Sequence, residues 1–317
     1  MIKNEQGMGK ATSVTPKKWL RINNKKIFYY SLLAYPLLQF CIFYIGVNFQ
    51  SVLFAFQKYE NNQFVFLTED ILGNFKDIIN HFGVKDNTVL WAFQNSVILW
   101  VFSIIFGMGI AIFFSYYIFK RVKTGRFFRF VLFLPSILPG VLLCIIFKLF
   151  TSDVLPVLFG CEKLLETTDD SIRLTTIIAY NIFLGFGTQV LLYSNSMEQI
   201  SPSVLEAAQL DGITPLRELW LIIVPSIMGT ISTFVIASIA GMFTSQANLY
   251  NFYGESGMNF PRTNTLGYYM FVIVQPGSMM GFGRDYYGYA SALGLCCTVV
   301  VIVPTVLFRK FSKKFEE

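Results

Sequence analysis

The sequence predicts an all-α membrane protein with six transmembrane helices. Hydrophobic residues make up 54% of the 317 residues, charged residues only 14%, and the mean hydropathy is +0.54. Such a composition is typical of a chain that folds in lipid. Six apolar runs without Asp, Glu, Lys, Arg or His provide the spans, at residues 28–56, 88–119, 130–146, 174–197, 219–253 and 286–308.

The first elements are a basic tail and an apolar anchor. Residues 1–27 are polar and rich in lysine, and no small-residue cleavage site follows the first run, so we expect an uncleaved anchor. The first two runs are long enough to cross the roughly 30 Å hydrocarbon core. The third run contains Pro135 and Pro139, which are expected to kink or interrupt its helix.

The distribution of lysine and arginine predicts the orientation. Residues 1–28 contain seven of them, the 120–129 turn five and the tail after Phe308 four, whereas the loops 57–87, 151–173 and 254–285 contain three, two and two. Basic segments favour the cytoplasm. We therefore expect both termini inside, including the short tail 312–317, and these three loops outside.

One apolar piece, residues 266–274, is too short to cross the bilayer. We expect a re-entrant or surface helix on the outer side. It belongs to the 254–285 loop, which is rich in Gly, Tyr, Asn and Met. This loop is either a solvated connection or a contact for an extracytoplasmic partner.

A polar segment between the fourth and fifth runs predicts a short helix outside the membrane, at about 201–212. Ser201 is expected to cap it, with Pro202 at its first position. Gly212 is expected to end it in the left-handed conformation. From periodicity alone, this helix is either a docking element or a plain connector at the membrane surface.

A sequence motif in this segment carries a resemblance. Glu206-Ala207-Ala208, three residues, Gly212, nine residues and Ile222-Ile223-Val224-Pro225 resemble the cytoplasmic loop signature of type I ABC importer permeases, with Val224 in place of leucine. Asp211 beside Gly212 resembles the carbohydrate-uptake branch, whose members take up maltose, glycerol phosphate, and oligo- or polysaccharides. The resemblance implies a coupling helix that docks on an ATPase through Glu206, Ala207, Ala208, Asp211 and Gly212.

The resemblance also implies partners and a location. Expected partners are a second homologous permease, two ATPase subunits that carry ATP and Mg, an extracytoplasmic solute-binding protein and membrane lipid, but no nucleic acid. The 28–311 region would be the permease domain, in the cytoplasmic membrane of a bacterium. The chain itself is expected to bind no cofactor and to break no bond.

The residues themselves argue against other classes. A proton-coupled carrier usually needs a titratable group near the bilayer midplane, and the six runs have none. The chain also lacks a GxxxxGK[ST] phosphate-binding loop. The single histidine, His81, lies in a predicted outer loop, and four of the five cysteines lie in apolar runs. We therefore expect no catalytic residue, no metal site and no disulfide framework.

Uncharged polar residues in the spans suit a neutral, hydroxyl-rich solute, although many of them are expected to hold helices together. Aligned on Glu206, the maltose transporter's larger permease implies a set of pathway residues on the spans before and after the loop: Asn181, Leu184, Gly185 and Thr188, then Ser238, Met242 and Ser245. Thr188, Met242 and Ser245 depart from the residue types expected there. Two alternatives remain. These residues could serve only to pack the helices together, and the chain could belong to an ABC importer for a solute other than a sugar.

Overall fold

The computed structural model describes residues 24–316, except 69, 85, 121, 278–280 and 282. The chain divides into two units between Ser51 and Val52. The first unit is helical from Asn24 onward, through α1 (Asn24–Gln39), the π-helical η1 (Phe40–Gly46) and the start of α2 (Val47–Phe54). Its side chains from Phe28 onward are exposed. The first predicted span is therefore helical, and its surface is apolar on all sides.

The second unit contains long apolar helices at the predicted runs. The second run forms one candidate span, Thr88–Lys120, from α4 (Thr88–Phe102), η3 (Ser103–Met108) and α5 (Gly109–Lys120). The fourth run forms α9 (Asp170–Met197). The last forms α16 (Tyr287–Glu316), which follows the short η8 (Arg284–Tyr286). By length and composition, the described residues provide five candidate spans, or six if one bent pair is counted.

The bent pair corresponds to the fifth run. It joins α11 (Pro215–Glu218), η5 (Leu219–Ile223) and α12 (Val224–Ser226) to α13 (Met228–Gly241), with a bend of 71°. Helix α13 ends at Gly241, and the short α14 (Leu249–Tyr253) begins only after an irregular stretch. The prediction of one span over 219–253 therefore covers a bend and a break.

The prediction for the third run was wrong in its boundaries. The helix α6 (Val122–Ile137) ends near Pro139, and a new helix then runs through α7 (Gly140–Leu149), η4 (Phe150–Val154) and α8 (Leu155–Phe159). Pro139 is extended and precedes this helix, which continues into the predicted outer loop 151–173 as far as Phe159. The candidate span Gly140–Phe159 contains Lys148, whose Nζ donates to Phe252 O at 3.2 Å. The expectation that the spans carry no charge therefore fails here.

The fold is also not purely α-helical. Strands β1 (Gln57–Glu60) and β2 (Gln63–Phe66) form an antiparallel hairpin, with Gln57 opposite Phe66. Asn61 and Asn62 form the turn with φ of 50° and 64°, a conformation that asparagine adopts more readily than most residues. The hairpin is followed by α3 (Gly73–Ile79) and η2 (Asn80–Val84).

The predicted short helix near 266–274 is present as α15 (Leu266–Ile273), after η6 (Gly254–Asn259) and η7 (Pro261–Thr263). Six of its residues are buried, so it packs inside the unit. The irregular backbone before it is held by α4. Asn95 Nδ2 donates to Arg262 O at 2.7 Å and to Asn264 O at 3.0 Å, and Ser96 Oγ accepts from Leu266 N at 2.9 Å.

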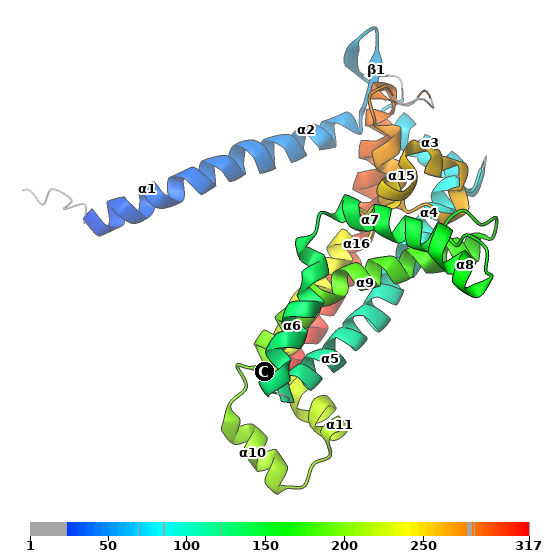
Figure 1. Ribbon diagram of the computed structural model, residues 1–317. Coiled ribbons are helices and arrows are strands. Elements are labelled where there is room, and N and C mark those ends of the chain that lie inside the picture. Colours follow the sequence, from blue (N-terminus) through cyan, green and yellow to red (C-terminus); the bar gives the residue numbers. More distant parts are fainter. Residues whose placement is uncertain are drawn as a thin grey trace, which may run out of the picture. The chain divides into compact units, whose positions relative to one another are not determined.

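Three apolar clusters form the core of the second unit. They lie between α5, α9 and the bent pair, between α4, α15 and α16, and between α7, α9 and α14. Figure 1 shows α5, α6, α9 and α16 side by side in the bundle, with α10 (Pro202–Leu210) and α11 at one end and β1, α3 and α15 at the other. The predicted cytoplasmic loop and the predicted outer loops thus lie at opposite ends of this unit.

Gly187 on α9 lies where α6 crosses closest. A Cβ at this position would overlap the backbone of Leu132, whereas a Cβ at Gly185 would meet only Gln189 Nε2, at 3.8 Å. We predict that Gly187→Ala lowers stability by about 1–3 kcal/mol, because the helices must separate. Gly185→Ala is the matched control, and thermal unfolding of the detergent-solubilised protein is the measurement. Equal unfolding temperatures for the two variants would contradict this packing.

Candidate functional site

Helix α10 occupies the segment that carries the motif. Pro202 is at its first position, as predicted, but Ser201 does not cap it through its side chain, because its hydroxyl pairs with Ser203 Oγ at 2.8 Å. The C-terminal end of α10 is as predicted. Gly212 has φ of +67°, Gly212 N donates to Gln209 O at 3.1 Å, and Ile213 N donates to Ala208 O at 3.2 Å. This pair of bonds is a Schellman motif, which needs a left-handed residue.

The five predicted coupling residues differ in their exposure to solvent. Glu206, Ala207, Asp211 and Gly212 are exposed, whereas Ala208 is buried and packs inward. The sequence reasoning missed Leu210, which is 89% exposed beside them, although an apolar residue outside the spans was a visible signal. An exposed leucine offers apolar surface that contact with a partner protein would remove from water.

Two ion pairs hold the ends of the segment that carries α10 to the basic 120–129 turn. At its exit, Glu218 is 5% exposed, and its carboxylate lies 2.6 Å from Lys120 Nζ and accepts from Tyr116 Oη at 3.2 Å. At its entry, Arg129 lies 2.5 Å from Glu198. The basic residues of this turn were predicted only as an orientation signal, but two of them also fix the segment to α5 and α6.

The break between α13 and α14 is the second feature. Ala247 and Asn248 have φ of 50° and 60°, a conformation that costs about 1 kcal/mol or more for a residue other than glycine. Asn181 on α9 holds it in place. Its Nδ2 donates to Ala247 O at 3.0 Å and to Ile177 O at 2.8 Å, and its Oδ1 accepts from Asn248 Nδ2 at 3.0 Å.

Helix α15 supports the same break from another side. Thr265 Oγ1 donates to Ser245 O at 3.0 Å. Gly267 lies so close to the Thr244 carbonyl that a Cβ would be 2.6 Å from it. Irregular backbone at membrane depth is tolerated only where it is buried in protein or lines a water-filled cavity. The contacts from α9 and α15 bury part of the break, and Thr244 and Ser245 remain exposed.

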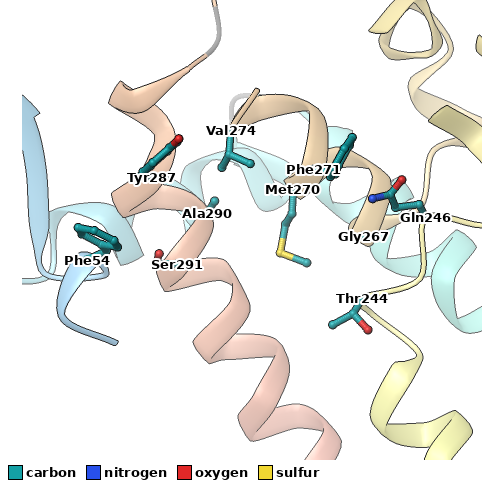
Figure 2. Close-up of a pocket in the computed structure, with 10 residues that line it drawn as sticks. All are labelled: Phe54, Thr244, Gln246, Gly267, Met270, Phe271, Val274, Tyr287, Ala290 and Ser291. Atoms are coloured by element: carbon teal, nitrogen blue, oxygen red, sulfur yellow. The ribbon is translucent and has the colours of Figure 1, made fainter. Parts of the chain in front are cut away.

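A pocket of about 430 Å³ opens beside this break. Figure 2 shows its walls: Thr244 and Gln246 lie on the segment after α13, Met270 extends from α15 toward α16, and Tyr287, Ala290 and Ser291 lie on α16. The remaining lining residues are Phe54, Gly267, Phe271 and Val274. The lining is apolar and aromatic with a few hydroxyl and amide groups, which is typical of a site for an uncharged ligand.

The structure brings only some of the predicted pathway residues to this place. Met242 and Ser245 lie in the break, and Asn181 bonds to it, but the amide of Asn181 already has three partners. Ser238 lies on α13 and accepts from Trp100 Nε1 at 3.2 Å. The other three lie on α9, with Leu184 and Gly185 half-buried and Thr188 exposed. Thr244 and Gln246 were noted in the sequence only as polar residues of a span.

Residues 87–317 match the family model described as binding-protein-dependent transport system inner membrane component. The chain belongs to this family. Together with the long apolar helices, this membership makes it a multi-pass membrane protein and a component of a transport system. The Glu-Ala-Ala motif of its α10 is typical of that family.

Individual relatives are similar over most of the chain. The multiple sugar-binding transport system permease protein MsmF of Streptococcus mutans is 24% identical over 295 residues, which cover 90% of this chain and 96% of the relative. The polygalacturonan/rhamnogalacturonan transport system permease protein YteP of Bacillus subtilis is 24% identical over 297 residues, or 87% and 86%.

Solved structures share the fold. A bacterial ABC transporter involved in the import of the acidic polysaccharide alginate matches with a TM-score of 0.74 and 17% identity, over 93% of this chain and 98% of that one. The alginate transporter in complex with alginate pentasaccharide-bound periplasmic protein matches with a TM-score of 0.72 and 17% identity, over 92% and 96%.

The ion pair between Glu218 and Lys120 predicts that reversing one charge destabilises the protein and that exchanging both charges restores its stability. Glu218→Lys places two cations together and should lower stability by about 1–3 kcal/mol, and adding Lys120→Glu should restore most of the loss. Glu198→Gln is the control, because its exposed ion pair is expected to contribute less than about 1 kcal/mol. Thermal unfolding of the purified protein measures all three variants. No recovery in the double variant would show that the pair does not hold the segment.

Proposed function

We propose that this chain forms half of the translocation pathway of an ATP-driven importer for a sugar, specifically an oligo- or polysaccharide fragment. The observation that carries this proposal is the exposed helix α10, with the family motif, held rigidly at one end of the bundle. The names of the relatives, which include a multiple sugar and a polygalacturonan permease, support the sugar class. The fold of the alginate importer supports the polymeric form.

The proposed orientation has both termini in the cytoplasm. It is supported by the basic tails and the basic 120–129 turn, which lies at the same end of the second unit as α10. In this orientation α10 faces the cytoplasm, where an ATPase subunit can bind it. The hairpin, α3 and the 254–263 segment then face outward.

In the proposed mechanism each kind of subunit has a separate role. Two ATPase subunits bind ATP and Mg, and their closure moves α10. Because the buried Glu218 ties the exit of the segment to α5, a displacement of α10 is passed to the bundle at that end. A second, homologous permease completes the pathway, and an extracytoplasmic binding protein delivers the sugar.

The break at residues 242–248 is proposed to line the pathway. Thr244 and Ser245 are exposed there and Gln246 is half-buried, and all three are uncharged. Hydroxyl and amide groups exchange hydrogen bonds with sugar hydroxyls at little electrostatic cost. Asn181 is assigned a different role from the one the alignment implied: it positions the break, since its amide groups are bonded to the chain itself.

Reconstitution of the whole complex tests the function. The permease pair, ATPases and binding protein in proteoliposomes should take up a neutral or acidic oligosaccharide in an ATP-dependent way. The same sugar should stimulate ATP hydrolysis. Stimulation by an amino acid, phosphate or a metal, with no response to any oligosaccharide, would replace the sugar proposal with a non-sugar importer.

The left-handed conformation of Gly212 predicts which substitutions at this position disrupt coupling to the ATPase. Apart from its two chain neighbours, no atom of the described residues lies within 4 Å of a Cβ placed there, so a substitution is strained only by its φ of +67°. Gly212→Val should weaken co-purification of the ATPase and abolish uptake, whereas Gly212→Asn, which tolerates this φ, should retain both. Glu206→Lys should resemble Gly212→Val, because an exposed carboxylate on the docking helix is reversed in charge. Wild-type uptake in Gly212→Val would reduce α10 to a connector.

A further inference from the structure

Two of the three segments predicted as outer loops, 57–87 and 254–285, meet around a pocket of about 560 Å³. Arg284 Nη1 donates to Tyr59 Oη at 3.1 Å and so joins η8 to the hairpin. Asn74 Nδ2 donates to Ala55 O at 2.9 Å and to Gln57 O at 3.1 Å and so joins α3 to it. We call this cavity the outer pocket. Its lining is Lys58, Asn74, Asp77, His81, Asp86, Thr88, Met258, Asn259, Pro261, Tyr269, Asp285, Tyr286 and Tyr289.

One wall of the outer pocket is a fixed polar cluster. His81 Nδ1 lies 2.8 Å from Asp86 Oδ2, and Thr88 N donates to Asp86 Oδ1 at 3.1 Å. Partial burial raises the pKa of Asp86, but the bonds from His81 and Thr88 outweigh it, so the pKa falls below its usual value. The carboxylate is therefore ionised at neutral pH and acts only as an acceptor.

Tyr289 supplies an independent sign of a ligand. Its side chain is 8% exposed, and its ring meets the His81 ring edge to face, with centroids 6.0 Å apart. By distance and angle its hydroxyl has no hydrogen-bond partner within the described part of the chain, although it interacts with the nearby Tyr269 hydroxyl. A buried hydroxyl without a partner costs about 1–3 kcal/mol. A ligand hydroxyl in the pocket would remove this cost.

We propose that the outer pocket binds one unit of a neutral saccharide before it enters the pathway, an inference that rests on the proposed sugar function. The carboxylates of Asp77, Asp86 and Asp285 accept bonds from sugar hydroxyls, Asn74 and Asn259 offer amides, and the tyrosines offer ring faces.

Charge gives the pocket its selectivity. The lining contains three carboxylates against one lysine, and Lys58 is already paired with Glu60 at 3.2 Å. An acidic sugar is therefore repelled. Within the described ranges no three acidic, histidine or cysteine side chains are placed to hold a metal ion, which argues against a cation as the ligand.

The test uses the assembled complex in nanodiscs without the binding protein. The probes are maltotriose and trigalacturonic acid, a neutral and an acidic trimer, and saturation-transfer NMR measures the dissociation constant of each. Wild type should bind maltotriose more tightly than trigalacturonic acid. Tyr289→Phe, which removes only the hydroxyl, should weaken maltotriose binding roughly three- to tenfold. Asp285→Asn should reduce the preference for the neutral trimer.

Two matched variants control for structural effects. Tyr193→Phe removes another buried tyrosine hydroxyl without a described partner, and Asp153→Asn removes an exposed carboxylate away from the outer pocket. Both should bind maltotriose as wild type does. Equal effects of Tyr289→Phe and Tyr193→Phe, or tighter binding of the acidic trimer by wild type, would overturn the proposal.

Uptake measurements distinguish a failure of the saccharide inference from a failure of the proposed importer function. If oligosaccharide uptake is ATP-dependent but unaffected by Tyr289→Phe at limiting sugar, the pocket is not a saccharide site and the importer stands. If the pocket variants abolish only the stimulation of ATPase by the binding protein, the surface contacts that protein and the saccharide inference fails. If no sugar is transported at all, the proposed function fails.

Discussion

The hydrogen bonds of Asn181 to the break between α13 and α14 are the interaction on which the rest of the structure depends. A chain that leaves the helical conformation inside a membrane must satisfy its polar groups within the protein. Here one amide from α9 bonds to Ala247 and Asn248, and Thr265 donates to Ser245 from the opposite side. The break is thus fixed by bonds from two sides, and α15 packs against it.

Helix α9 links this break to both ends of the second unit. It contains 28 residues, so it is about 42 Å long. Near its start, the guanidinium of Arg173 stacks over Phe260, with 4.1 Å between Cζ and the ring centroid. Past its end, Glu198 is paired with Arg129. One continuous helix therefore connects the entry of the α10 segment to the break and to the 254–263 segment.

Local signals predicted much of the fold and of the α10 end. The uncharged runs located most spans, and Pro202 and Gly212 located α10, because helix length and the φ of glycine depend on nearby residues. The hairpin was missed although Asn61-Asn62 is a turn signal. The third span was predicted at 130–146, whereas the candidate span in this region is Gly140–Phe159, which includes Lys148.

Contacts between distant segments of the chain could not be predicted from the sequence. Asn181 and Ala247 are 66 residues apart, and nothing in either segment indicates the bond. The same is true of Lys120 and Glu218, since a basic turn and a lone glutamate also fit two solvated surfaces. The outer pocket depends on two loops meeting, which requires the folded bundle.

The most direct test of the central claim, that α10 couples this chain to an ATPase, is a cross-linking measurement at Leu210. A photo-reactive amino acid at this exposed position should cross-link to the ATPase subunit in native membranes, and trapping the complex with vanadate and ATP should change the yield. The same group at Val157, which is exposed at the other end of the unit, should give no such product. Cross-linking from Val157 but not from Leu210 would contradict the account.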